Sequence, residues 1–172
     1  MSLGAIIISP FSRKLRVDDP SRENPKHYAH WPDLIRMIKN SFPSLTITQI
    51  GVDGEKILPG IDQSKFSLSF RDLFFLIKDC ALWISIDNFL PHFCNAYFGE
   101  SKPGVVIFTR SDPSIYGYGY NFNILKSRQF LRPDQFGIWE ESTYDPNSSP
   151  DPKAVFECVQ ECLLRSLPKD LF

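Results

Sequence analysis

The sequence predicts an α/β fold, an open and mostly parallel Rossmann-like sheet with helices on both faces. Apolar runs of strand length, such as Gly4–Ser9 and Ala81–Ile86, are typical of parallel strands that are buried on both faces. Amphipathic segments of helical period lie between the runs. Strands that alternate with helices favour right-handed crossovers and a parallel sheet. The 172-residue chain has the size of one domain, so we expect a single domain over residues 1–172.

The first half of the chain contains a complete βαβ pattern. Strand Gly4–Ser9 is followed by a long polar connection and then by a helix at Trp31–Phe42, which has proline at its second position. The β-branched segment Leu45–Gly51 predicts the next strand. A second helix is expected at Ser69–Cys80, because Ser69 is followed three residues later by an acid, as in a capping box.

The alternation continues in the second half. Strand Ala81–Ile86 comes next, then a short helix at Pro91–Phe98 and a strand at Gly104–Thr109. Beyond it, an aromatic and glycine-rich region predicts only short strands, around Asn121–Leu125 and Phe136–Trp139. A last amphipathic helix is expected at 152–167, after a proline-rich connection.

Composition excludes several function classes. The formal net charge is -1, which gives no general attraction to nucleic acid or to anionic membranes. The longest apolar runs are far shorter than the roughly 20 residues of a membrane span, and the N-terminus lacks the pattern of a secretion signal, so we expect a cytoplasmic protein. The four cysteines form no Cys-x-x-Cys pair, and we expect neither a metal nor another cofactor.

Candidate site residues follow the predicted strands, where ligands bind in such sheets. The first strand is followed by hydroxyls and cations suited to a diphosphate or, alternatively, to a solvated loop: Ser9, Ser12, Arg13, Lys14, Arg16 and Lys26. Asp53 and Glu55 follow the second strand and suit either a ribose hydroxyl or a simple turn. After the third strand, Asp87 and His92 suit either an anion or a capped helix with a packed histidine.

The segment ISIDNFLPHFCNAYFG, followed by KPGVVIFTRSDP, resembles the donor-site signature of glycosyltransferase family nine, the ADP-heptose:lipopolysaccharide heptosyltransferases. In that signature a strand leads to Asp-Thr-Gly-x-x-His, and Asp87 and His92 keep the spacing. The family's other elements appear in the same order, with Lys26 before a Trp-Pro helix start and Glu55 after the next strand. The resemblance covers residues 4–167 and implies the C-terminal, donor-binding half of a two-domain GT-B enzyme.

The resemblance also implies roles for the donor site. Lys26 would contact the diphosphate and Glu55 the ribose, while Asp87 and His92 would contact the phosphate or sugar. Ser9 and Ser12 would line the phosphate turn. We also expect Arg13 and Asn88 among the residues that bind the donor. The ligand would be a nucleotide-diphosphate sugar, and transfer would be inverting and metal-independent, with the general base supplied by an N-terminal acceptor domain that this chain lacks.

Two features depart from the family pattern. Asn88-Phe89 stands where the family has Thr-Gly, so a bulky side chain replaces a glycine that permits close backbone approach. The stretch Tyr116–Tyr120 has no counterpart in the family, and it either walls the sugar pocket or packs against the domain. The nucleotide base, the sugar and the acceptor stay open.

Three functions follow from this reading. The first is a donor-binding domain that acts with a missing or separate acceptor domain. The second is a stand-alone module that binds or senses a nucleotide or nucleotide sugar without turnover. The third is a nucleotide-processing enzyme, such as an N-glycosidase or a deoxyribosyltransferase-like hydrolase. It would need an exposed glutamate facing the sugar carbon, and the sequence offers no clear candidate for it.

Overall fold

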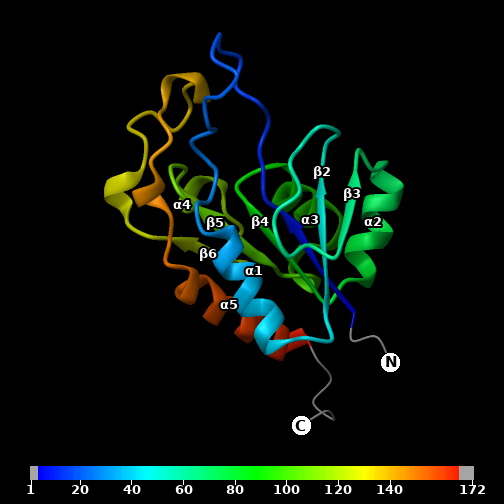
Figure 1. Cartoon of the computed structure of the whole chain (residues 1–172). Coiled ribbons are helices and arrows are strands. Elements are labelled where there is room, and N and C mark those ends of the chain that lie inside the picture. The colour runs from blue at the N-terminus through cyan, green and yellow to red at the C-terminus, as the bar shows by residue number, and fades with distance from the viewer. Residues whose placement is uncertain (1–3, 167–172) are drawn as a thin grey trace.

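A computed structural model describes residues 4–166 and contains one six-stranded, fully parallel sheet (Figure 1). The strand order is β3-β2-β1-β4-β5-β6. The strands are β1 Ala5–Ser9, β2 Thr46–Gly51, β3 Gln63–Phe66, β4 Leu82–Ile86, β5 Val105–Phe108 and β6 Phe122–Leu125. The predicted α/β, Rossmann-like fold is confirmed.

Helices cover both faces of the sheet. They are α1 Trp31–Ser41, α2 Phe70–Asp79, α3 Phe89–Phe98, α4 Pro113–Tyr116 and α5 Pro152–Ser166. Figure 1 shows α1 and α5 side by side over one face, and α2 and α3 belong to the other. Ile6 and Ile8 point into the core beneath α1 and α5, whereas Ile7 points into the core beneath α2 and α3. Because alternate side chains of β1 are buried in two different cores, apolar residues are needed at successive positions. This explains the continuous apolar run in the sequence.

The helix starts match the local signals. Pro32 lies in the first turn of α1, where its missing N–H is not needed. The Ser69 hydroxyl oxygen accepts a 3.1 Å hydrogen bond from the Asp72 amide and caps α2. Helix α3 begins at Phe89, two residues earlier than predicted, because Asn88 caps it.

Three elements differ from the prediction. Strand β3 was not predicted, and neither was the short helix α4. The segment 136–139 is not a strand; bends at Phe136 and Gly137 lead into a 3-10 helix at Trp139–Glu141, and Phe136 is 82% exposed. The last helix is described as far as Ser166, so Leu167 lies outside the described residues. None of the helices within residues 4–166 combines the length and apolar character that a membrane span requires.

Candidate functional site

The carboxyl ends of the parallel strands meet at one edge of the sheet, and a charged cluster lies there between β4 and β5. Asp87 follows β4 directly and its side chain is only 5% exposed. Its Oδ2 accepts a 2.6 Å hydrogen bond from the Ser111 hydroxyl and lies 3.0 Å from Lys26 Nζ. Lys26 belongs to the long β1–α1 connection, which the Thr109 hydroxyl also holds through the Pro25 carbonyl at 2.9 Å.

Trp139 brings a second cation to this cluster. Lys26 Nζ lies 4.5 Å from the centre of the Trp139 ring, and the Arg132 guanidinium carbon lies 3.6 Å from it. Arg132 is buried and donates to the carbonyls of Gly137 and Gln135, while its Nε has no hydrogen-bond partner among residues 4–166. Two largely buried cations thus accompany one carboxylate, an arrangement that favours an added anion.

Both the nitrogen and the oxygen of the Asn88 carboxamide form hydrogen bonds within the domain. Its Nδ2 donates to the Ser9 carbonyl, the Ser9 hydroxyl and the Phe11 carbonyl at 3.2, 2.9 and 2.9 Å. Its Oδ1 accepts from the Leu90 amide at 2.9 Å and from the Ser85 hydroxyl at 2.8 Å. The side chain therefore fastens the ends of β1 and β4 together while it caps α3. This role was not anticipated, although an asparagine directly before a helix is a recognised capping signal.

Glu55 provides an unused acceptor at the end of β2. Its Oε2 is buried and has no hydrogen-bond partner among the described residues. Burial raises the pKa of Glu55 above its ordinary value. The carboxylate lies over Gly51, where an added Cβ would meet Oε2 at 1.9 Å. Asp53, the alternative candidate, is exposed.

Three residues predicted for the donor site, Arg13, Ser12 and His92, make their contacts outside the Lys26–Asp87 cluster. Both terminal guanidinium nitrogens of Arg13, Nη1 and Nη2, donate to the Glu140 carboxylate, at 2.7 and 3.1 Å, and this ion pair lowers the pKa of Glu140 to about 2. The Ser12 amide donates to His27 Nε2 at 3.4 Å. His92 is exposed, and its Nδ1 lies 2.8 Å from the Tyr118 hydroxyl.

The Tyr116–Tyr120 stretch packs against α3. Tyr118 contacts His92, and the Tyr120 hydroxyl donates to the Asn95 side chain. Tyr116 donates to the Gln135 carbonyl. All three tyrosine hydroxyls are therefore held by protein groups.

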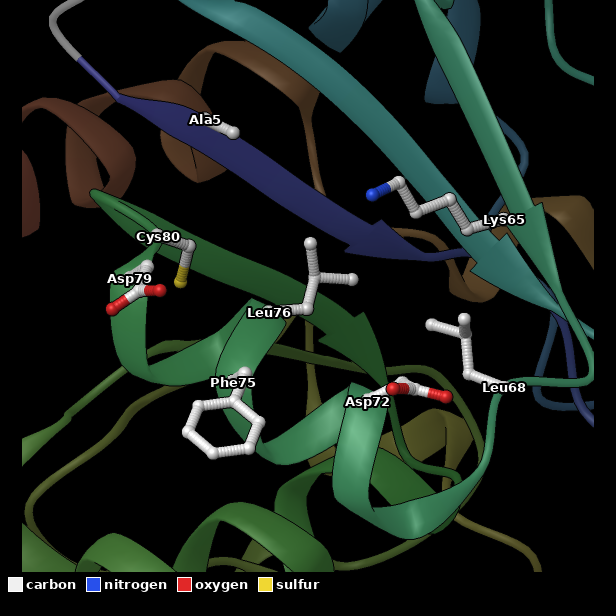
Figure 2. Close-up of a pocket in the computed structure, with 8 residues that line it drawn as sticks. All are labelled: Ala5, Lys65, Leu68, Asp72, Phe75, Leu76, Asp79 and Cys80. Carbon is white, nitrogen blue, oxygen red and sulfur yellow. The ribbon is translucent and has the colours of Figure 1, made fainter.

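Two hollows mark the surface. A 260 Å³ cavity lies between the β1–α1 connection and residues 56–59, and Phe11, His27 and Tyr144 are among its lining residues. The larger hollow, of 470 Å³, lies between α2 and the β3 side of the sheet (Figure 2). It reaches from Leu68 to Ala5, the first residue of β1, and so extends away from the carboxyl edge.

Comparison with solved structures defines the class of fold: it is that of one half of a heptosyltransferase-like glycosyltransferase. The chain is similar to ADP-heptose lps heptosyltransferase II of E. coli, with a TM-score of 0.63 and 14% identity, over 94% of this chain and 47% of that one. It is similar to the iron-containing dodecameric heptosyltransferase TibC of enterotoxigenic E. coli, solved with ADP-D-beta-D-heptose, with a TM-score of 0.64 and 13% identity over 95% and 46%. The glycosyl transferase family 9 structure from Veillonella parvula gives a TM-score of 0.58 and 15% identity over 96% and 47%.

At these identities the likeness concerns the fold, and the chain spans about half the length of the proteins it matches. No family model matches the sequence, and no curated protein matches it.

Proposed function

We propose that this chain is the donor-binding half of a heptosyltransferase-like glycosyltransferase and binds a nucleotide-diphosphate sugar at the carboxyl edge of its sheet. The observation that carries the proposal is the buried pair of Lys26 and Asp87 at the end of β4, beside Arg132 and Trp139. In open parallel sheets this edge is where ligands bind. The TibC structure, which has the same fold, was solved with ADP-D-beta-D-heptose.

The cluster suits a diphosphate because its cations are preorganised. Asp87 and the Trp139 ring hold Lys26 Nζ in place, so little side-chain freedom is lost when an anion arrives. Lys26 and Arg132 together exceed the charge of Asp87, which leaves positive charge for the phosphates. Fixed cations that face a leaving nucleoside diphosphate stabilise the negative charge that develops during glycosyl transfer, without a metal.

Glu55 supports the same orientation of the ligand. It follows β2, which neighbours β1 on the side opposite β4. A nucleotide sugar whose diphosphate lies at Lys26 would direct its ribose toward β2, where the buried Glu55 Oε2 lacks a donor. A ribose hydroxyl would supply that donor once the Glu55 side chain turns Oε2 toward the edge of the sheet.

The proposal includes a second component for the transfer step. The matched proteins are about twice as long as the region that aligns with this chain, so about half of each of them has no counterpart here. We propose that an acceptor-binding domain or subunit completes the site and supplies the general base, while this chain holds the donor.

Calorimetric titration with nucleoside diphosphates, nucleotide sugars and the corresponding nucleosides tests the proposal. We expect Lys26→Met to weaken binding of diphosphate ligands by about ten- to a hundredfold, because a charge-assisted contact is lost. Lys39→Met is the matched control, since Lys39 pairs with Asp62 beside α1 and should leave binding unchanged. The double variant Lys26→Met, Asp87→Asn removes both buried charges and checks that weaker binding does not reflect an unpaired Asp87.

Two results would contradict the proposal. The wild-type chain could bind no nucleotide of the panel, or Lys26→Met could bind diphosphates as tightly as the wild type. All three variants must first show the wild-type circular dichroism spectrum, so that a loss of binding is not a loss of fold.

A further inference from the structure

Helices α2 and α3 carry a continuous aromatic surface. Its seven members are Phe70, Phe74, Phe75, Phe89, Phe93, Tyr97 and Phe98, and neighbouring rings have centroids 4.6–6.1 Å apart. Four of these side chains are 48–63% exposed, namely Phe70, Phe75, Phe89 and Tyr97. Exposed apolar groups that are clustered in this way mark an interaction surface, whereas single ones are ordinary.

The size of this aromatic surface fits a protein interface. An aromatic side chain contributes about 150–250 Å² when it is buried, so four that are half exposed offer roughly 400 Å². A standard interface covers about 800 Å² on each partner. The aromatic surface thus accounts for about half of one side, and the neighbouring surface of α2 must contribute the rest.

Charges on α2 flank the aromatic surface in two rows of opposite sign. At 100° per residue, Arg71 and Lys78 form one row and Asp72 and Asp79 form the other, with Phe75 midway between them. All four charged side chains are exposed, and none forms an ion pair within residues 4–166. The surface therefore carries its own complementary charges.

The two rows border different features. The basic row lies toward α3, because Phe74, on the same side of α2, contacts Tyr97 and Phe98. The acidic row lines the 470 Å³ groove on the far side of α2, where Leu76 points into the hollow (Figure 2). Across this face the order is therefore groove, acidic row, Phe75, basic row and aromatic helix α3.

We infer that this face binds a second copy of the chain about a two-fold axis parallel to α2. Such an axis reverses the order across the face, so the aromatic side of α3 in each copy meets the groove of the other. Arg71 of one copy then faces Asp72 of the other, and Lys78 faces Asp79. The contact is self-complementary in both shape and charge, and it does not depend on donor binding at the carboxyl edge.

The charge balance favours a second copy over a membrane. Binding of an aromatic surface to anionic lipid requires an excess of basic residues around it. Here the two basic side chains of α2 are matched by two acidic ones at mirrored positions about Phe75. That symmetry suits an identical partner.

Sedimentation velocity of the full chain, from low to high micromolar concentration, tests the inference. We expect a concentration-dependent species of twice the chain mass. Phe75→Ser should weaken the association at least tenfold, as an interface centre does when an aromatic anchor is removed. Phe136→Ser makes the same change at a more exposed phenylalanine outside this face, and should leave the association unchanged.

A charge exchange tests the direction of the axis. Lys78→Asp places like charges opposite one another and should weaken the association, whereas Lys78→Asp combined with Asp79→Lys should restore it. A chain that is monomeric at every concentration, or a dimer that Phe75→Ser leaves intact, would overturn the inference. Failure of the double variant to restore association would overturn the parallel pairing of α2.

Discussion

Replacing Asn88 by alanine should destabilise the whole carboxyl edge of the sheet. The carboxamide makes five hydrogen bonds that join the end of β1, the end of β4 and the first turn of α3. Alanine removes all five at once. Asn88 was predicted from the sequence as a donor-binding residue, whereas its hydrogen bonds hold together the framework beneath the site.

The expected loss follows from the separate contacts. Removal of the helix cap costs about 1 kcal/mol. The carbonyls of Ser9 and Phe11 and the Ser9 hydroxyl lose a shared donor, and each partly buried group left without a partner costs about 1 kcal/mol. Since water can reach part of this half-buried region, we expect a total of about 3 kcal/mol in the free energy of unfolding.

Urea unfolding followed by circular dichroism measures this loss. Asn88→Thr keeps a capping oxygen but loses the amide NH2 group that reaches three acceptors, so it should be about 1 kcal/mol more stable than Asn88→Ala. Asn147→Ala is the control, because Asn147 is exposed and engages only its backbone in hydrogen bonds. If Asn88→Ala unfolds within about 0.5 kcal/mol of the wild type, the side chain does not hold the two strand ends together.

Two further stability predictions follow from buried positions. Because burial raises the pKa of Glu55, the native state keeps this proton to higher pH than the unfolded chain, and stability falls as pH rises from the usual glutamate pKa to the raised one. Glu55→Gln should therefore match the wild-type melting temperature below about pH 4 and exceed it at neutral pH, and a pH-independent difference would refute the assignment. An alanine Cβ at Gly104 would lie 2.2–2.5 Å from the buried Trp83 ring. Gly104→Ala should therefore lower the free energy of unfolding, measured in urea, by about 1–3 kcal/mol. Gly119→Ala is the control and should be neutral, because its Cβ would meet nothing within 4 Å.

Five of the six strands could be predicted, and the clearest signals come from those buried on both faces. In β1, β4 and β5 nearly every side chain contacts a core, so the apolar run itself indicates the strand. Strand β3 is an edge strand of sequence QSKF with three exposed side chains. Main-chain hydrogen bonds to β2 hold this strand in the sheet. Such bonds do not depend on side chains, so the residue pattern did not indicate the strand.

The candidate site divides in the same way. The positions of Asp87 and Glu55 could be predicted, because parallel strands end at one edge and the residues after them gather there. Their partners could not be predicted. Arg13 meets Glu140 across 127 residues, and Lys26 meets Asp87 through a connection whose path depends on contacts with the segment around Trp139. Such contacts depend on how two long loops pack against each other, and they cannot be predicted from the local sequence.

The departure from the family signature at 88–89 has a physical explanation in these contacts. Asn88 reaches three acceptors on the β1 side that the shorter threonine hydroxyl cannot bridge together. Phe89, at the position of the family's glycine, stacks on Phe70 at 5.6 Å with its side chain 53% exposed, and so extends the aromatic surface outward. Both residues lie where β4 passes into α3. Asn88 joins the strand ends at the edge of the sheet, and Phe89 enlarges the surface that we assign to a second copy. Because Phe89 contributes to the aromatic surface and Asn88 to the framework, Phe89→Gly should weaken self-association in sedimentation velocity, and an unchanged association would exclude Phe89 from the interface.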